Sequence, residues 1–95
     1  MPKGYVIVRV EVTDPAKWAE YVAKSKIALE KFGGNPIVRG GKCEIAEGTG
    51  RPRNVVLEFP DYDAARGYAF SPEYAEAKKL RQGAGSMDMV IVEGV

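Results

Sequence analysis

The chain has 95 residues and a nearly balanced charge, with 14 Lys and Arg against 13 Asp and Glu and a formal net charge of +1. This length suits one domain, so we treat residues 1–95 as a single unit whose thin core buries roughly 60–65% of the unfolded surface. No basic stripe indicates nucleic acid, and no apolar run resembles a signal region or a membrane span. A single Cys excludes an internal disulfide, and we expect a cytoplasmic protein.

The sequence contains no His. This excludes His-based catalytic triads, imidazole general bases and His-ligated zinc or haem, and one Cys cannot build a thiolate metal site. We therefore expect neither a metal nor a cofactor. Any chemistry would depend on carboxylates, Tyr, Arg, Lys, Ser or Cys43.

The first two elements are a strand and a helix. Gly4–Val12 has Val at every even position from 6 to 12 and a mixed set at odd positions, which predicts a strand with one face against helices. Asp14 and Pro15 then begin a helix, because Asp caps free N–H groups and Pro suits the first turn. The apolar stripe of this helix comprises Trp18, Tyr21, Val22, Ser25, Ala28, Leu29 and Phe32. Gly33-Gly34 ends it.

A glycine-interrupted segment and a central strand follow the helix. We interpret Pro36–Arg39 and Lys42–Ala46 as halves of one bent strand or of a hairpin-like edge, with Gly40-Gly41 as a bulge or turn. The segment Arg53–Pro60 predicts a strand that ends at its proline. Its odd positions from 55 to 59 are apolar, whereas the other face carries Glu58 among apolar neighbours.

The last third of the chain predicts two short helices and a strand. One helix is expected over Asp61–Phe70, with Asp61 or Asp63 near its start, and another from its cap Ser71 through Leu80-Arg81. The strand is expected over Ser86–Val95. The order β-α-β-β-α-β predicts an α+β, ferredoxin-like fold with a four-stranded antiparallel sheet. Right-handed crossovers place the first and third strands in the middle and the helices on one face.

The opposite face of this sheet has no cover within the chain. It would carry Tyr5, Ile7, Arg9, Glu11, Val56 and Glu58. A face of this mixed character favours a symmetric homodimer in which two sheets enclose a partly polar cavity, a dimeric α+β barrel.

Short motifs spread over essentially the whole chain support this fold. They include Arg39-Gly40-Gly41, Glu58-Phe59-Pro60, Ser71-Pro72-Glu73-Tyr74 and Leu80-Arg81. Together they resemble domain-of-unknown-function family 1330 of the dimeric α+β-barrel superfamily. The resemblance implies a ferredoxin-like protomer and a homodimer, but no established reaction. The wider superfamily includes cofactor-free monooxygenases, muconolactone isomerases, haem-dependent enzymes and stress-responsive barrels, and the absence of His counts against the haem-binding branch.

Glu58 is the candidate catalytic residue. Beside apolar walls its carboxyl group would be desolvated, which raises a carboxyl pKa and suits acid–base work. The alternative is a structural ion pair with Arg9 or Arg39 that fixes the sheet.

Further residues are candidates for substrate binding, and each has a structural alternative. The predicted set is Tyr5, Arg9, Arg39, Ser71, Tyr74 and Arg81. Arginines, with Arg53 as a further member, would bind a carboxylate through the guanidinium fork, and tyrosines would donate to a substrate oxygen. Equally, Arg81 suits a helix C-terminus, Ser71 a helix cap, and each tyrosine a half-buried ring with a wet hydroxyl.

Two functions remain open from the sequence. One is a homodimeric barrel that binds a small, anionic organic molecule between sheet and helices, with cofactor-free isomerase, lyase or monooxygenase chemistry at Glu58. The other is a non-catalytic stress or accessory module whose polar groups serve dimerisation.

Overall fold

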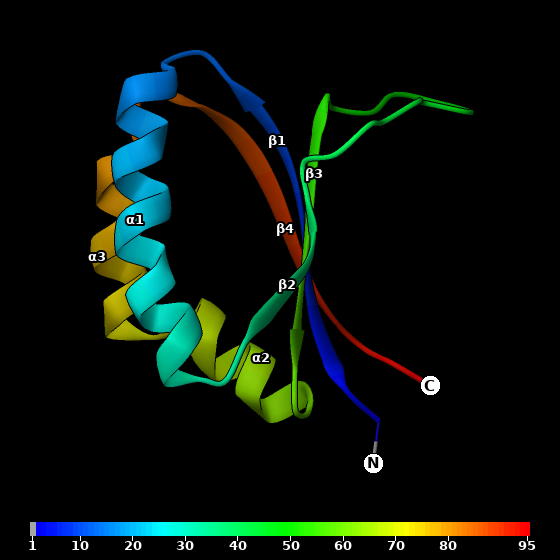
Figure 1. Cartoon of the computed structure of the whole chain (residues 1–95), viewed down its shortest axis with the longest axis vertical. Helices are drawn as coiled ribbons and strands as arrows, with labels where there is room; N and C mark the ends of the chain where they lie inside the picture. Colours follow the sequence, from blue (N-terminus) through cyan, green and yellow to red (C-terminus); the bar gives the residue numbers. More distant parts are fainter. Residues whose placement is uncertain (1) are drawn as a thin grey trace.

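In the computed structural model, which describes residues 2–95, the chain forms two layers, a four-stranded sheet and helices that cover one of its faces (Figure 1). The strands are β1 (Gly4–Val12), β2 (Asn35–Arg39), β3 (Arg53–Phe59) and β4 (Gly85–Glu93). The helices are α1 (Pro15–Lys31), α2 (Tyr62–Ala69) and α3 (Pro72–Leu80). Within residues 2–95, none of these helices has the length and apolar character needed to cross a membrane.

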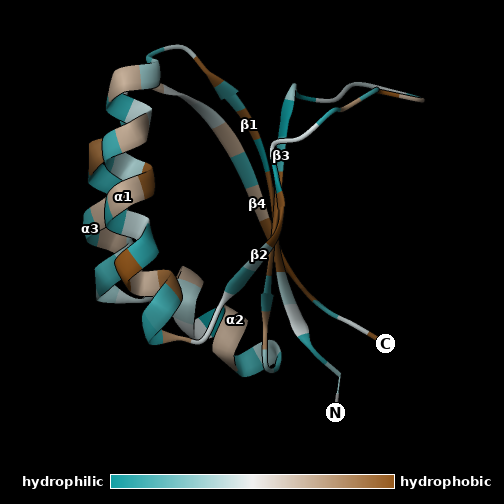
Figure 2. Cartoon of the chain, in the orientation of Figure 1, coloured by the Kyte–Doolittle hydropathy of each residue, from teal (hydrophilic) through white to brown (hydrophobic). Residues whose placement is uncertain are grey.

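The sheet has the predicted topology. Its strand order is β2-β3-β1-β4, and every neighbouring pair is antiparallel, so β1 and β3 lie in the middle as expected. The even positions of β1 face the helices, with Val6 fully buried and Val10 almost so, which confirms the valine face as the core side. Figure 2 shows hydrophobic residues concentrated along the middle of the sheet.

The prediction of a second half-strand at Lys42–Ala46 is wrong. Residues 40–52, which we call the arm, contain no strand and lead away from the helices beyond the sheet (Figure 1). The arm begins at Gly40, whose amide donates to the carbonyl of Asn54. The positive φ of Gly40, 72°, turns the chain away from β3 at this point. The side-chain amide of Asn54 donates to the Cys43 sulfur and to the Arg51 carbonyl, so local contacts replace a strand ladder at the base of the arm.

A β-bulge lies in β2, earlier than the glycine pair where the sequence suggested it. Pro36 pairs with Leu57, but Val38 pairs with Val56 and Arg39 with Val55, so the register shifts between residues 36 and 38. Because side chains alternate faces, a shift of one residue moves every later side chain of β2 to the opposite face. The bulge therefore turns Arg39 toward the helices.

The three helices begin at the predicted caps. The carboxylate of Asp14 accepts from the Lys17 amide at 3.2 Å, and that of Asp61 accepts from the Ala64 amide at 2.7 Å. The hydroxyl of Ser71 accepts from the Tyr74 amide at 3.0 Å. Each bond satisfies an N–H group that has no partner within its own helix.

A chain of aromatic rings fills the space between the layers. Centroids lie 5.0 Å apart for Trp18 and Tyr21, 6.1 Å for Tyr21 and Tyr74, and 5.2 Å for both Tyr74–Tyr68 and Tyr68–Phe59. The hydroxyls of Tyr21 and Tyr74 share a buried hydrogen bond of 2.8 Å. Burial, reinforced by the neighbouring Tyr74, raises the pKa of Tyr21 well above its ordinary value. Burial also raises the pKa of Tyr68.

The start of β1 gives a test of close backbone packing. Gly4 is buried, and a Cβ added there would overlap the backbone of Asp61 and Tyr62. We predict that Gly4→Ala lowers the free energy of unfolding by about 2 kcal/mol, because overpacking forces the backbone apart. Gly41→Ala is the matched control, since a Cβ there meets nothing within 4 Å, and we expect a change within about 0.5 kcal/mol. Urea denaturation measures both, and equal midpoints would contradict this packing.

The buried phenols give a pH dependence. The unfolded chain loses its tyrosine protons near pH 10, whereas folding raises the pKa of Tyr21 and of Tyr68. We therefore predict that the free energy of unfolding is unaffected by these groups below about pH 10 and falls as the pH rises further. Above about pH 10, the free energy of unfolding of Tyr21→Phe should fall less steeply with pH than that of the wild type. Tyrosinate absorbance followed beside circular dichroism checks this, and ionisation of Tyr21 without unfolding would contradict it.

Candidate functional site

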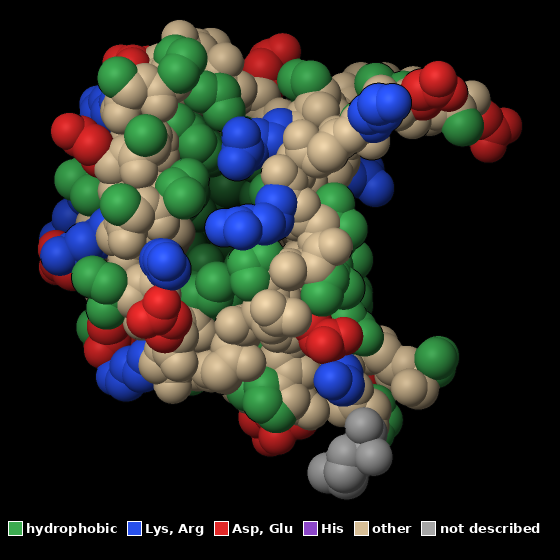
Figure 3. Space-filling view, in the orientation of Figure 1, with side chains coloured by type: hydrophobic (Ala, Val, Ile, Leu, Met, Phe, Trp, Pro, Cys, Tyr) green, Lys and Arg blue, Asp and Glu red, His purple; other side chains and the backbone are tan. Residues whose placement is uncertain are grey.

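A pocket of about 370 Å³ lies between α1 and the helix-facing side of the sheet. We call it the helix–sheet pocket. Figure 3 shows a hollow at this position with a hydrophobic floor and Lys or Arg side chains along its sheet-side rim. The backbone of α1 packs closely against α3 and lies apart from the sheet (Figure 1), and the pocket is lined by side chains of α1 and of the strands.

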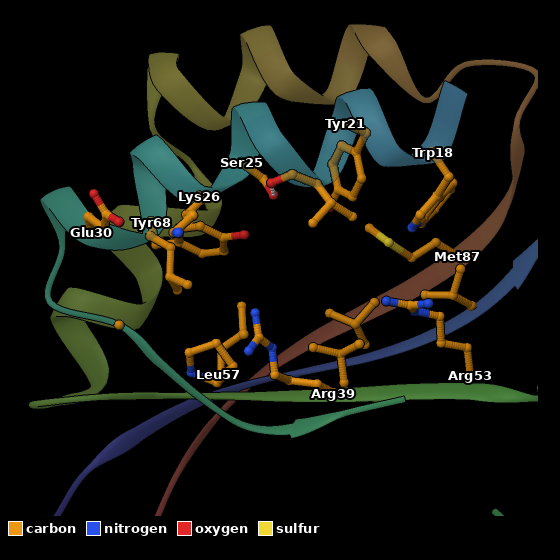
Figure 4. A pocket seen from close by; sticks show the side chains of 17 residues that line it. Trp18, Tyr21, Ser25, Lys26, Glu30, Arg39, Arg53, Leu57, Tyr68 and Met87 are labelled. Carbon is orange, nitrogen blue, oxygen red and sulfur yellow. Dashed lines mark hydrogen bonds between the residues drawn. The ribbon is translucent and has the colours of Figure 1, made fainter. Parts of the chain in front are cut away.

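The walls of the helix–sheet pocket are mostly apolar. The stripe of α1 contributes Trp18, Tyr21, Val22, Ser25 and Leu29, which are spaced so that they share one face of the helix. The floor comes from the helix-facing residues of the central strands: Val8, Val10, Val55 and Leu57. Met87 of β4 closes one end (Figure 4).

Two arginines supply positive charge on the sheet side of the pocket. Arg39 reaches it because of the bulge in β2, and Arg53 reaches it because odd positions of β3 face the helices. Gly40 leaves room for Arg53, whose Cγ would lie 3.1 Å from an added Cβ. Among residues 2–95 neither arginine forms an ion pair. Both are exposed at the mouth, so their charges face a molecule that enters.

The helical side of the pocket adds polar groups of other kinds. Lys26 and Glu30 lie on the exposed rim of α1, one turn apart. The hydroxyl of Tyr68 points into the space (Figure 4), and its raised pKa keeps it a neutral donor. Ser25 is already bonded, since its hydroxyl donates to the Val22 carbonyl at 3.1 Å. The pocket can therefore offer hydrogen-bond donors and positive charge to an apolar ligand with an acidic group.

Glu58 lies on the other face of the sheet, outside the helix–sheet pocket. Its carboxylate accepts from the Tyr5 hydroxyl at 3.1 Å and pairs with the Lys3 ammonium at 3.2 Å. The hydrogen bond to Glu58 is the main cause of a raised pKa at Tyr5. The predicted partners were Arg9 or Arg39, and this was wrong. Arg39 faces the helices, and Arg9 lies opposite Asn54 and Asp88 in the sheet.

Three further candidates gather at α3. The Ser71 hydroxyl is buried and donates to the Tyr68 carbonyl at 2.8 Å while it caps α3, so its hydrogen-bonding capacity is used by the fold. Tyr74 bonds Tyr21, and Arg81 ends α3 with its guanidinium 5.6 Å from the Tyr21 ring centroid. The seven candidates are thus divided among three places: Arg39 in the helix–sheet pocket, Tyr5, Arg9 and Glu58 on the helix-free face, and Ser71, Tyr74 and Arg81 beside α3.

Three further pocket residues differ in how clearly the sequence indicated them, and of these Arg53 was named as an anion-binding candidate. Arg53 has the same parity as Val55 and Leu57, so alternation alone places it on the helix-facing side. Trp18 belongs to the apolar stripe of α1, which identified it as a core residue but not as a wall. Tyr68 gave no signal, because only the packing of α2 decides where its hydroxyl points. In residues 2–95 no three Cys, Asp or Glu side chains are grouped to hold a metal ion.

Comparison with known proteins identifies the family and the fold. A family described as "Domain of unknown function (DUF1330)" matches residues 3–95. No curated protein matches the chain. Among solved structures, the chain is similar to RPA0582 from Rhodopseudomonas palustris, a protein of unknown function, with 19% identity, a TM-score of 0.77 and coverage of 99% of this chain and 83% of that one.

Two other solved structures share the fold over most of their length. SnoaB from Streptomyces nogalater, a cofactor-independent oxygenase, has 12% identity and a TM-score of 0.65, with 97% of this chain and 92% of that chain covered. A dimeric ferredoxin-like protein of unknown function from Jannaschia has 14% identity and a TM-score of 0.62, with 96% and 98% covered. At these identities the likeness establishes a shared α+β, ferredoxin-like fold. With its family match over residues 3–95, this chain belongs to the DUF1330 family.

Proposed function

We propose that the protein binds a small organic anion with an apolar or aromatic body in the helix–sheet pocket. The observation that carries the proposal is the pair Arg39 and Arg53, which line the mouth of a mostly apolar pocket and form no ion pair among residues 2–95. The planar guanidinium groups match a carboxylate, and the apolar walls would cover the body of the same ligand.

The size and lining of the pocket support a small ligand. Its volume of about 370 Å³ lies within the range of small-molecule sites, which is about 300–1,000 Å³. Trp18, Leu29 and Leu57 would cover the apolar body, since aromatic and branched side chains gain most from removing such a surface from water. The Tyr68 hydroxyl would donate to a second oxygen of the ligand (Figure 4).

The geometry favours binding over acid–base turnover inside this pocket. The carboxylate expected to act as general acid or base, Glu58, lies across the sheet, and the pocket itself contains only Glu30, at the exposed rim. A catalytic Glu58 remains a separate prediction that requires a substrate on the helix-free face. If Glu58→Gln keeps full turnover on an identified substrate, the prediction that Glu58 is catalytic is wrong. The two arginines at the pocket mouth also favour ligand binding over a purely structural dimerisation module, whose polar groups would lie in the dimer contact.

We also propose that two protomers form a homodimer through their helix-free sheet faces. This face exposes Val38, Val90 and Val92 to 41%, 51% and 38%, beside the partly buried Tyr5 and Ile7. Adjacent apolar side chains on one exposed sheet face are typical of a protein–protein contact. Similar structures described as dimeric and ferredoxin-like support the same arrangement here. The residues that line the helix–sheet pocket lie on the other, helix-facing side of the sheet.

Loss of one arginine should weaken anion binding. A thermal-shift screen of aryl carboxylates, with cinnamate as the reference probe, identifies a binder, since ligand at a hundred times its Kd adds about 2.7 kcal/mol of stability. We predict that Arg39→Gln and Arg53→Gln each weaken binding about fivefold, because an exposed charge pair contributes up to about 1 kcal/mol. Calorimetric titration measures the Kd, and higher salt should narrow the difference.

Arg66→Gln is the matched control for these variants. Arg66 is an exposed arginine of α2 whose guanidinium lies over the Phe70 ring, outside the pocket lining. Its loss changes the net charge equally but should leave the Kd unchanged. Equal weakening by all three substitutions would show a non-specific charge effect and would refute the proposed site.

A charge in the helix-free face should separate the dimer. We predict that wild-type protein sediments as a dimer and Val90→Asp as a folded monomer, because an aspartate within an apolar contact is desolvated without a partner. Ile27→Asp places the same charge at an exposed position of α1, 58% accessible, and should stay dimeric. Analytical ultracentrifugation distinguishes these states. A wild-type protein that is monomeric at micromolar concentration would contradict the proposed assembly.

A further inference from the structure

A second groove follows the outer edge of the sheet, between β4 and helices α2 and α3. Its volume is about 510 Å³, and its apolar surface comes from Met87, Met89 and Ile91 on β4 and from Phe70 after α2. We call it the β4 groove. It lies outside the helix–sheet pocket. Of the residues that line the two cavities, only Met87 lines both, whereas Tyr21 lines the pocket and Tyr74 lines the groove.

The fold leaves this strip of β4 incompletely covered. Met87, Met89 and Ile91 alternate onto the helix-facing side, opposite Val10, Val8 and Val6 of β1. Because β4 is an edge strand and α3 packs mainly against α1, the three side chains remain only partly buried. Successive strand residues rise by about 3.3 Å, so the strip from Met87 to Ile91 is roughly 13 Å long.

Positive charge gathers at one end of the strip. A short turn joins α3 to β4, and the two elements run in opposite directions (Figure 1). Arg81 directly follows α3, so it lies toward the Met87 end of the strip, whereas Phe70 precedes α3 and lies toward the Ile91 end. Lys78 and Arg81 both line the groove, whose lining includes no carboxylate. Within residues 2–95 neither forms an ion pair, and the buried Arg81 Nε has no hydrogen-bond acceptor. The dipole of α3 favours a positive charge at its C-terminus, which explains why a cation lies here. It does not explain why the Arg81 guanidinium keeps an N–H donor without an acceptor.

Phe70 marks the other end of the strip. Its side chain is 71% exposed, and leaving so much apolar ring surface in water is energetically unfavourable. Methionines suit a flexible ligand, because their unbranched side chains adjust to irregular shapes. The groove thus combines a charged end, an adaptable apolar strip and an exposed aromatic ring.

We propose that the β4 groove binds an amphiphilic carboxylate of the medium-chain fatty acid type. The carboxylate would accept from Arg81 and Lys78, and the aliphatic chain would lie along Met87, Met89 and Ile91 toward Phe70. This site is separate from the proposed aryl-anion site. Its ligand differs in shape, being a narrow chain along a strip of β4 rather than a compact body between α1 and the sheet.

The methionines provide a readout that separates the two sites. The chain has three Met residues, of which Met87 lines both cavities and Met89 lines the β4 groove alone. In protein with ¹³C-labelled Met methyl groups, decanoate should shift the signals of Met87 and Met89 together and saturably. Cinnamate in the helix–sheet pocket should shift Met87 without Met89. If decanoate does not shift the Met89 methyl signal, the proposal is wrong, and this holds whether or not cinnamate shifts the Met87 signal.

Further probes and variants test the charge. Acetate, which lacks the chain, and decyltrimethylammonium, which reverses the charge, should leave Met89 unshifted at the decanoate concentration used. Arg81→Gln should weaken decanoate binding about tenfold, and Lys78→Gln should weaken it as an independent check if Arg81→Gln proves unfolded. Lys79→Gln removes the same charge one residue away, outside the groove lining, and should match the wild type. Equal binding of decanoate and decyltrimethylammonium, or no loss with both Arg81→Gln and Lys78→Gln, would refute the site.

Discussion

The row of aromatic rings from Trp18 to Phe59 sets the distance between the two layers of this protein. Four ring contacts link α1, α3, α2 and β3 in that order, with centroids 5.0 to 6.1 Å apart. Rings of this size hold α1 farther from the sheet than small aliphatic residues would. The Tyr21–Tyr74 hydrogen bond fixes the row at its centre, because each hydroxyl would otherwise be buried without a partner. The helix–sheet pocket and the β4 groove lie on the two sides of this row.

Most of the fold follows from local signals in the sequence. The valines of β1, the caps at Asp14, Asp61 and Ser71, and the order of elements predicted the strand order and the helical face. These features depend on neighbours within a few residues, which the sequence displays directly. The arm at residues 40–52 was the exception. Its segment Lys42–Ala46, with Cys43 and Ile45, suggested half of a bent strand or a hairpin-like edge, but within residues 2–95 no strand pairs with it.

The candidate site could be predicted only in part, and the reason is register. A regular β2 would place Arg39 opposite Asn54, on the same face as Glu58, as the sequence suggested. The bulge between Pro36 and Val38 moves Arg39 to the other face, and nothing in the local sequence fixes the position of that bulge. Conversely, Lys3 lies before β1 and was not considered as a partner for Glu58, although antiparallel pairing brings the start of β1 beside the end of β3.

The two faces of the sheet therefore have different physical character. The helix-facing side combines a pocket with two arginines that form no ion pair within residues 2–95. The helix-free side combines exposed valines with the Lys3–Glu58–Tyr5 contacts. Ligand binding and assembly can then occupy opposite faces without competition.

The central claim is that the helix-facing pocket holds an organic anion. The most direct measurement is a crystal structure grown with a brominated cinnamate, with bromine located by its anomalous scattering. The account predicts bromine between α1 and β3 and the carboxylate on Arg39 and Arg53. Bromine only elsewhere, or an empty pocket at saturating ligand, would contradict it.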